Sequence, residues 1–451
     1  MASTSLSRTP SSNGNKKTFT ISSWVKISTT SSEKSISHAG TTGGNYTLFD
    51  FNSSNQLRAI WTSGGSTLAN VSTNAVYRDT NAWYHVVFAV DTTQATSSDR
   101  IKFYVNGEQI TSFSSSTYPS QNTDTFHNDT SYANNVGKYI STGGSDTSFF
   151  DGSMGHYHFI DGTAYDASAF GETDATTGIW KPKTAPSVTY GTNGFFLKFE
   201  NSGSMGTDSS GNVNNFSVNG NLTQTIDTPS NVFATLNTLI KPTTDNLTIE
   251  NGNLSRTNGT SAAWTQIYTT IGASSGKWYF EAKIDSTSNS DGFLFGIADV
   301  DSFNNSSGVN IGTVTRNYLY QSNGNKRTSG TDTSFGDTLT TGDIVGVAFD
   351  LDNNYIYFSK NGTWQNSGDP TSGASGTGSA FSITSGYTYC PAFATYYTTD
   401  DFSANFGNGY FGTTAVSSAE NPDDGIGIFE YDVPTGYKAL CTKSINAQEY
   451  S

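Results

Sequence analysis

Residues 101–107, IKFYVNG, decide the fold class of the first half of the chain. Ile101, Phe103 and Val105 alternate with other residues, so their side chains share one face, as in a strand that is covered on one side. The Asn-Gly pair that follows supplies the positive φ angles that a two-residue hairpin turn requires. The stretch therefore predicts a β-hairpin.

A second copy of this pattern occurs later in the chain. Residues 355–362, YIYFSKNG, repeat the spacing I-x-F-x-x-N-G. Each copy follows a strand pattern V-x-x-A-x-D, which is VVFAVD in residues 86–91 and VGVAFD in residues 345–350. Two linked matches in the same order predict two domains of similar architecture.

The composition favours strands throughout. Of 451 residues, 14% are charged, 13% are aromatic and 46 are glycine. Ser, Thr, Asn and Gly are weak in helix interiors, whereas aromatic and β-branched residues suit strands. We predict an all-β protein of two tandem antiparallel β-sandwiches. Pro and small polar residues at 227–230, DTPS, interrupt the strand pattern, so we expect domains over residues 1–228 and 229–451.

The charge excludes some partners. The net charge is −15, and the 23 Lys and Arg residues are scattered rather than clustered. Nucleic acid and anionic membranes are therefore not expected partners. The polar N-terminus has no apolar core of a signal peptide, and no apolar run reaches the length of a membrane helix, so we expect synthesis in a cytoplasm. Cys390 and Cys441 form no disulfide framework and are expected to be buried free thiols.

Three motifs in the first half resemble the laminin-G-like, concanavalin A-like lectin superfamily. They are FTISSWVK at 19–26, AWYHVV at 82–87 and FYVNG at 103–107. In most such domains, stretches similar to FLKFE at 196–200 and DSSGN at 208–212 precede the first of these motifs, whereas here they follow all three. The order resembles a circular permutation, which a sandwich with neighbouring termini tolerates.

The second half resembles a SPRY domain. The resemblance rests on GKWYFE at 276–281, FLFGIA at 293–298, GDIVGVAFDLD at 342–352 and FSKNG at 358–362. SPRY domains share the concanavalin-like sandwich, and the resemblance therefore explains the paired hairpins.

Further stretches resemble tail fibres and other virion proteins of bacteriophages, especially marine ones. They are FIDG at 159–162, FGETD at 170–174, WKPK at 180–183, YGTNGF at 190–195 and PTGYKALC at 434–441. This resemblance implies a location in the virion, with other virion proteins as partners.

No pattern predicts catalysis. Sandwich glucanases place carboxylates two residues apart on one strand, and the nearest pairs are Asp299-Val300-Asp301 and Asp350-Leu351-Asp352. We assign these pairs to turns, where Asp side chains accept hydrogen bonds from nearby backbone amides. We predict that the protein is not an enzyme and has no cofactor.

The five histidines all fall in the first half, at positions 38, 85, 127, 156 and 158. His156 and His158 alternate on one strand, but no third ligand completes a metal site, so none is predicted. The sequence leaves open whether a calcium site exists. His85 lies inside an apolar strand and is expected to be a hydrogen-bonded core residue.

Aromatic side chains carry the remaining functional signal, because flat rings stack on sugars or fill interfaces. Trp24, Trp83 and Trp278 lie in strand motifs and are expected to be structural. Trp61, Tyr320 and Trp364 lie near expected strand ends, where exposure is easier. They are the predicted ligand-binding residues.

These observations favour a non-enzymatic virion protein, a tail fibre or adhesin that binds a host surface glycan or receptor. One alternative is a capsid or tail decoration protein that binds only other virion subunits. Another is a polysaccharide depolymerase. A homo-oligomer is expected, and fibres make a trimer the natural form by analogy. The host, the glycan and the position in the virion stay open.

Overall fold

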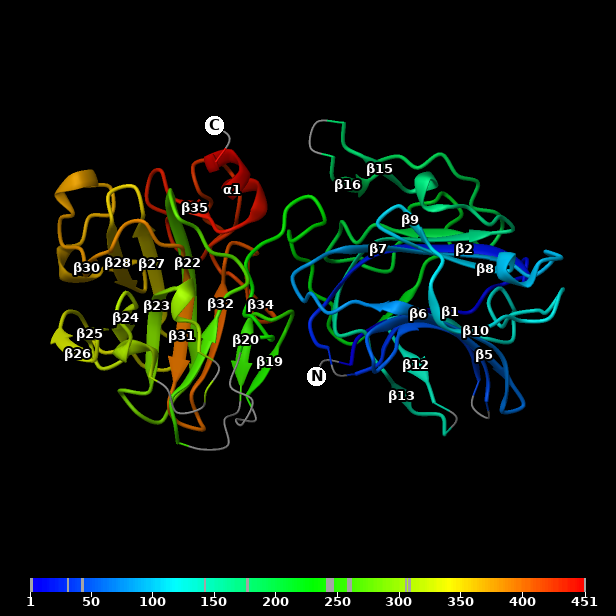
Figure 1. Cartoon of the computed structure of the whole chain (residues 1–451), viewed down its shortest axis with the longest axis horizontal. Helices are drawn as coiled ribbons and strands as arrows, with labels where there is room; N and C mark the ends of the chain where they lie inside the picture. Colours follow the sequence, from blue (N-terminus) through cyan, green and yellow to red (C-terminus); the bar gives the residue numbers. More distant parts are fainter. Residues whose placement is uncertain are drawn as a thin grey trace. The chain divides into compact units, whose positions relative to one another are not determined.

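The computed structural model describes residues 3–30, 32–41, 44–141, 143–175, 178–240, 247–257, 262–304, 306 and 310–449. The chain divides into two compact units, Met1–Gln224 and Thr225–Ser451, four residues before the predicted boundary at 228. Each unit is built from two antiparallel sheets that enclose a hydrophobic core (Figure 1). The protein is therefore all-β, as predicted from its composition.

The first unit contains an eight-stranded and a six-stranded sheet. The larger has the order β10-β6-β5-β4-β3-β11-β1-β18 and the smaller β17-β14-β2-β7-β8-β9. The strands of the larger sheet are β1 (Ser5–Arg8), β3 (Lys34–Thr41), β4 (Asn45–Phe51), β5 (Gln56–Ser63), β6 (Ser66–Val76), β10 (Phe113–Thr117), β11 (Asn134–Val136) and β18 (Ser217–Asn219). Those of the smaller sheet are β2 (Thr18–Ile27), β7 (Tyr84–Asp91), β8 (Ile101–Val105), β9 (Glu108–Ile110), β14 (Gly152–Asp161) and β17 (Phe195–Leu197).

Aromatic rings join the two sheets of this unit. Phe49 of β4 contacts Phe19 of β2 at 6.1 Å and Phe88 of β7 at 4.8 Å between ring centroids. Period-2 alternation directs these rings from both sheets into one core. Figure 1 shows the two layers, with β2, β7 and β8 in one and β5, β6 and β10 in the other. Smaller elements complete the unit: β12 (Tyr139–Ile140), β13 (Asp146–Thr147), β15 (Gly171–Thr173), β16 (Trp180–Pro182), η1 (Ser97–Asp99) and η2 (Ala167–Ala169).

The second unit contains a nine-stranded and a six-stranded sheet. The larger follows the order β19-β20-β32-β22-β27-β28-β29, with β30 on β28 and β35 parallel to β22. Its strands are β19 (Thr248–Glu250), β20 (Ser255–Thr257), β22 (Lys277–Ser286), β27 (Ile344–Asp350), β28 (Tyr355–Lys360), β29 (Thr363–Trp364), β30 (Phe381–Ser382), β32 (Asp401–Asn405) and β35 (Lys438–Ala439). The smaller sheet, β21-β31-β23-β24-β25-β26, consists of β21 (Thr265–Tyr268), β23 (Phe293–Asp299), β24 (Tyr318–Gln321), β25 (Asn325–Thr328), β26 (Thr331–Ser334) and β31 (Tyr389–Thr395).

Phenylalanine rings again link the two sheets. Phe393 of β31 lies 4.9 Å from Phe402 of β32 and 5.7 Å from Phe280 of β22. The other described elements are β33 (Tyr410–Phe411), β34 (Thr414–Ala415), η3 (Val300–Ser302), η4 (Ile311–Thr313), η5 (Gln365–Ser367), η6 (Gly373–Ser375) and α1 (Thr442–Glu449). None of the described helices has the length and apolar character of a membrane span.

The two predicted hairpins are confirmed, and they match in detail. Val105 pairs with Glu108 across one turn, and Lys360 pairs with Thr363 across the other. All four turn residues have positive φ: Asn106 50°, Gly107 91°, Asn361 49° and Gly362 79°.

The turn asparagines play the same part in both units. The side-chain Oδ1 of Asn106 accepts a hydrogen bond from the backbone N–H of His85, and Oδ1 of Asn361 accepts one from Ile344, both at 2.8 Å. Each asparagine thus joins its turn to the preceding strand.

We expect Gly107→Val and Gly362→Val each to destabilise its own unit by about 1 to 3 kcal/mol, because a β-branched residue is strained at positive φ. The new Cβ would also lie 2.8 Å from the ring of Trp180 at Gly107, and 2.7 Å from that of Tyr431 at Gly362. Urea denaturation followed by pulse proteolysis measures each unit separately.

Gly64→Val is the matched control, because Gly64 has a φ of 57° but open space around its Cβ position. Gly64→Val should lower the free energy of unfolding of the first unit by less than Gly107→Val does. The prediction would be contradicted if either hairpin variant reduced the stability of both units equally.

Candidate functional site

Two of the three predicted ligand-binding aromatics are core residues, so the expectation that they are exposed is wrong. Trp61 is 1% exposed and Tyr320 is 0% exposed. Trp61 shares the inward face of β5 with Leu57 and Ala59. The ring of Tyr320 stacks on Phe358 at 5.4 Å, and its hydroxyl donates to the carbonyl of Asp337. Period-2 alternation along each strand directs both rings inward, where no sugar reaches them.

Trp364 is the one predicted aromatic that keeps partial exposure. It follows the Asn-Gly turn of the second unit and contacts the ring of Tyr279 edge-on, with centroids 6.4 Å apart. A ligand role for Trp364 stays a prediction.

The predicted structural roles of the other aromatics and thiols are confirmed. Trp24, Trp83 and Trp278 are 3%, 9% and 1% exposed. Cys390 and Cys441 are free and buried.

The histidines are occupied by structural contacts. His85, predicted to be a core residue, lies 2.9 Å from the Ser22 hydroxyl through Nε2 and accepts a hydrogen bond from Trp180 Nε1 at 3.0 Å. His158 bonds the hydroxyl of Tyr190 at 2.9 Å. Across the described residues, no three or more His, Cys, Asp or Glu side chains form a group that could hold a metal ion.

The acidic pairs hold turns, as predicted. Asp350 accepts hydrogen bonds from the backbone amides of Asp352 at 3.0 Å and Asn353 at 2.8 Å. Asp299 accepts one from the amide of Asp301 at 3.1 Å and also pairs with Arg316 at 2.7 Å. These carboxylates are therefore committed to backbone and ion-pair contacts.

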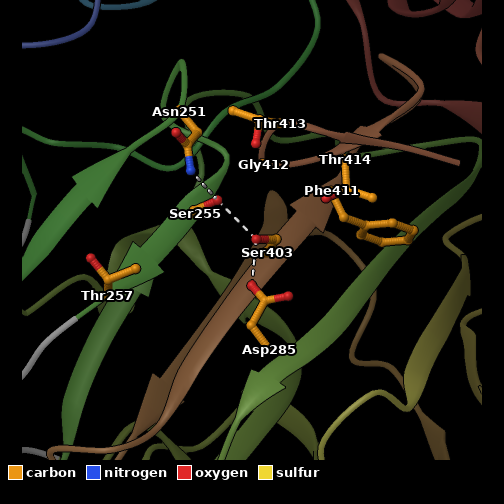
Figure 2. Close-up of a pocket in the computed structure, with 9 residues that line it drawn as sticks. All are labelled: Asn251, Ser255, Thr257, Asp285, Ser403, Phe411, Gly412, Thr413 and Thr414. Atoms are coloured by element: carbon orange, nitrogen blue, oxygen red, sulfur yellow. Dashed lines mark hydrogen bonds between the residues drawn. The ribbon is translucent and has the colours of Figure 1, made fainter. Parts of the chain in front are cut away.

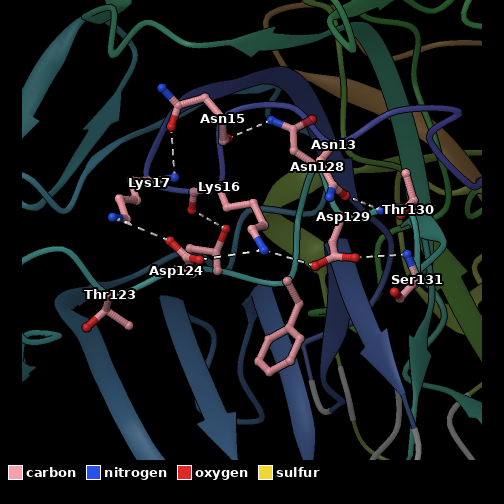
Figure 3. A network of polar contacts seen from close by, with 12 residues as sticks. Asn13, Asn15, Lys16, Lys17, Thr123, Asp124, Asn128, Asp129, Thr130 and Ser131 are labelled. Atoms are coloured by element: carbon pink, nitrogen blue, oxygen red, sulfur yellow. Dashed lines mark hydrogen bonds and ion pairs between the residues drawn. The ribbon is translucent and has the colours of Figure 1, made fainter.

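A polar network in the first unit supplies its own cation. The ammonium group of Lys16 lies 3.1 Å from Asp129 and 3.5 Å from Asp124, between the two carboxylates (Figure 3). The hydrogen bond that Lys16 donates to the Asp129 carboxylate raises the pKa of Lys16. The lysine thus occupies the position where an external cation would otherwise balance the two carboxylates.

The second unit contains a polar pocket of about 180 Å³ on the outer face of its larger sheet. Along β22 and β32, apolar residues such as Ile284 and Phe402 face the core, and the residues between them face outward. The pocket is lined by Asn251, Ser255, Thr257, Asp285, Ser403, Phe411, Gly412, Thr413 and Thr414. The lining residues lie on or beside β19, β20, β22 and β32 and on the hairpin β33–β34 (Figure 2).

A directed chain of hydrogen bonds crosses the floor of the pocket. Asn251 Nδ2 donates to Ser255 Oγ at 3.1 Å, and Ser255 Oγ lies 2.8 Å from Ser403 Oγ. Ser403 Oγ donates to Asp285 Oδ2 at 2.5 Å (Figure 2). Because the proton of Ser403 points to the carboxylate, Ser403 accepts from Ser255, and the chain runs in one direction to Asp285.

Asp285 lies at a β-bulge beside the pocket. Ile284 pairs with Phe402 and Ser286 pairs with Asp401, so Asp285 is an extra residue between two consecutive pairs. A bulge redirects a side chain and bends its strand. Burial raises the pKa of the Asp285 carboxyl, although the hydrogen bond from Ser403 and the charge of Lys283 lower it.

Gly412 brings the hairpin β33–β34 close to the two serines. Its φ is 61°, and a Cβ there would lie 2.5 Å from Ser255 Oγ and 3.2 Å from Ser403 Oγ. A larger residue would therefore fill the pocket. Phe411, which is 5% exposed, adds an apolar surface beside these hydroxyl groups.

Sequence reasoning missed this pocket. Its residues are separated by up to 163 positions, from Asn251 to Thr414, and none belongs to a motif with a known spacing. The one local signal was the polar alternation of Asp285 and Ser403 with apolar neighbours, which also describes any solvated strand face.

Comparisons with known proteins agree with the two units. Residues 2–168 match the model of the concanavalin A-like lectin/glucanases superfamily, and residues 277–409 match that of the SPRY domain. Both kinds of domain are typically binding modules. The chain contains a concanavalin A-like domain followed by a SPRY domain.

Two solved structures are similar to part of the chain. The SPRY domain of human HERC1 is 18% identical, with 38% of this chain and 96% of that chain covered and a TM-score of 0.30. A human SPRY domain is 16% identical, with 35% and 93% covered and a TM-score of 0.27. No curated protein matches the chain.

Proposed function

We propose that this chain is a non-enzymatic virion protein, a tail fibre or adhesin, and that its pocket in the SPRY domain binds one sugar of a host surface glycan. The pocket carries the proposal. It combines hydroxyl, amide and carboxylate groups with an aromatic side chain, Phe411, which is the chemistry that holds a sugar in place.

Several observations support this choice. The two domain types are typically binding modules. The carboxylate pairs that a sandwich glycosidase would use serve turns and an ion pair here, which favours holding over cutting. The virion location rests on the sequence resemblance to phage fibres, because a fold by itself does not define a function.

We expect the purified chain to bind host surface polysaccharide and to leave its length unchanged. Ser403→Ala removes the central hydroxyl of the hydrogen-bond chain and should weaken binding about tenfold. Ser359→Ala is the matched control, because Ser359 is a buried serine of the same sheet whose hydroxyl has no partner. Glycan arrays and calorimetry measure binding, and size-exclusion chromatography follows polymer length.

Other outcomes would contradict the proposal in different ways. Binding to virion subunits without binding to any glycan would favour a decoration protein. Polysaccharide that shortens with time would favour a depolymerase. If Ser403→Ala and Ser359→Ala bind the glycan equally well, the pocket is not the glycan-binding site.

A further inference from the structure

The hydrogen-bond chain leaves the pocket rich in acceptors. The proton of Ser403 goes to Asp285, and that of Ser255 goes to Ser403. One amide hydrogen of Asn251 goes to Ser255. Each serine oxygen still offers a lone pair to a ligand, and the carboxylate of Asp285 is an acceptor at both oxygens. A ligand group that contacts Ser255, Ser403 and Asp285 must therefore donate hydrogen bonds to them.

The charge of the pocket also favours a ligand that donates hydrogen bonds. Asp285 is the one charged residue among the nine that line it. Two charged residues lie near Asp285 outside the lining. The positive charge of Lys283 lowers the pKa of Asp285, and the negative charge of Asp401 raises it. Asp401 is in turn 3.7 Å from Arg256, a buried cation. The carboxylate at the end of the hydrogen-bond chain therefore decides the sign of the charge that a ligand meets first.

The size of the pocket limits the ligand. The pocket volume of about 180 Å³ is smaller than the several hundred Å³ of a site for a drug-sized ligand. It is several times the volume of a water molecule. One ring-sized group fits, with Phe411 beside its apolar edge and the hydroxyl chain beside its polar edge.

We propose that the pocket selects sugars by charge: it accepts a neutral or amino sugar that donates hydrogen bonds to Asp285, and it rejects acidic sugars. This inference rests on the proposed function. A sugar carboxylate presents only acceptors to the acceptor oxygens of Ser255, Ser403 and Asp285, and it brings a like charge to Asp285. An ammonium group supplies three donors and the opposite charge.

The test compares glucose, glucosamine and glucuronic acid as methyl glycosides, and the same three forms of galactose, by NMR titration of the full chain near neutral pH. We expect the amino form to bind about tenfold more tightly than the acidic form in at least one series. Asp285→Asn should bring the two affinities close together, because it removes the charge and keeps the shape.

Asp424→Asn is the matched control. Asp424 is an exposed carboxylate of the same unit that accepts a hydrogen bond from the amide of Ile426. Asp424→Asn removes one negative charge, as Asp285→Asn does, so the sugar preference of the Asp424→Asn variant should equal that of the unmodified chain. Urea denaturation of both variants verifies that they fold.

Three results overturn the inference. They are acidic sugars that bind as tightly as amino sugars, an Asp285→Asn variant that keeps the preference, and an Asp424→Asn variant that loses it. If no sugar of any class binds, and host polysaccharide does not bind either, the proposed function itself fails. Binding of the polysaccharide without a charge preference leaves the proposed function intact and rejects the selection.

Discussion

Acidification from about pH 7.5 to about pH 5 should destabilise the first unit on the order of 4 kcal/mol and leave the second unit as stable or more stable. Burial lowers the pKa of His38, His85 and His127 to about 3 each. An unfolded histidine titrates at about 6.5, so the unfolded chain takes up protons that the folded unit does not. The stability that the three neutral histidines contribute is therefore fully present above about pH 6.5, and it is lost as the pH falls below that value.

The surroundings of these rings explain the low pKa values. The ring of His127 packs against both Phe19 at 5.4 Å and Phe159 at 6.0 Å between centroids, and its Nε2 lies 3.0 Å from the Ser37 hydroxyl. A proton on such a ring would place a charge inside the core. Each of the three histidines contributes about 2 kcal/mol at about pH 5. Burial raises the pKa of Asp50 to about 6, which offsets part of this loss.

The second unit contains no histidine and responds with the opposite sign. Burial raises the pKa of Glu281 to about 7 and also raises those of Asp285 and Asp400. The folded unit therefore binds protons that the unfolded chain, with carboxyl pKa values of about 4, does not bind in this range. Its stability rises as the pH falls from about 7 toward about 4.5 and is lost as the pH rises.

Urea denaturation with pulse proteolysis at the two pH values measures both units, since the resistant fragments identify each one. His127→Gln is the internal control, because glutamine stays neutral and should reduce the acid effect on the first unit by about 2 kcal/mol. A first unit that keeps its urea midpoint at about pH 5, or a second unit that loses more than the first, would contradict the prediction.

Glu281→Ala should destabilise the second unit by about 3 to 5 kcal/mol. The carboxylate of Glu281 is 0% exposed. It accepts hydrogen bonds from the backbone amides of Glu430 and Tyr431, both at 2.9 Å. The hydroxyl of Tyr279 at 3.1 Å and the side-chain amide of Asn405 at 3.3 Å complete its partners. Alanine leaves these four donors buried without their acceptor.

Glu281→Gln separates the effect of charge from that of shape. Glu430 donates to Oε2 and Tyr431 donates to Oε1, so a side-chain amide must turn its NH₂ toward one backbone N–H. At about pH 8 we expect Glu281→Gln to destabilise the second unit less than Glu281→Ala does. Because glutamine does not titrate, residue 281 should then add no stability when the pH is lowered. Glu449→Gln, at an exposed carboxylate of α1, should change stability by less than about 0.5 kcal/mol. A Glu281→Ala loss as small as that of Glu449→Gln would show that these hydrogen bonds contribute little.

Local sequence determined the strands and the turns of this protein. The Asn-Gly pairs after residues 105 and 360 require positive φ whatever surrounds them, and the structure places both in two-residue hairpins. The aspartates that end the V-x-x-A-x-D strands bond amides two or three residues away, so a short stretch contains the whole interaction. Composition was enough to predict an all-β fold, because it reports the summed preference of many residues.

Tertiary structure alone decided exposure and the pocket. The sequence neighbours of Trp61 and Tyr320 predict easier exposure, but both are buried, because the face that a strand buries depends on which sheet covers it. Asp285 meets Ser403 across the paired strands β22 and β32, beside a bulge in their register, and Ser255 joins them from a third strand. Pairing between strands more than a hundred residues apart leaves no local pattern. The strands could therefore be predicted from the sequence, and the site could not.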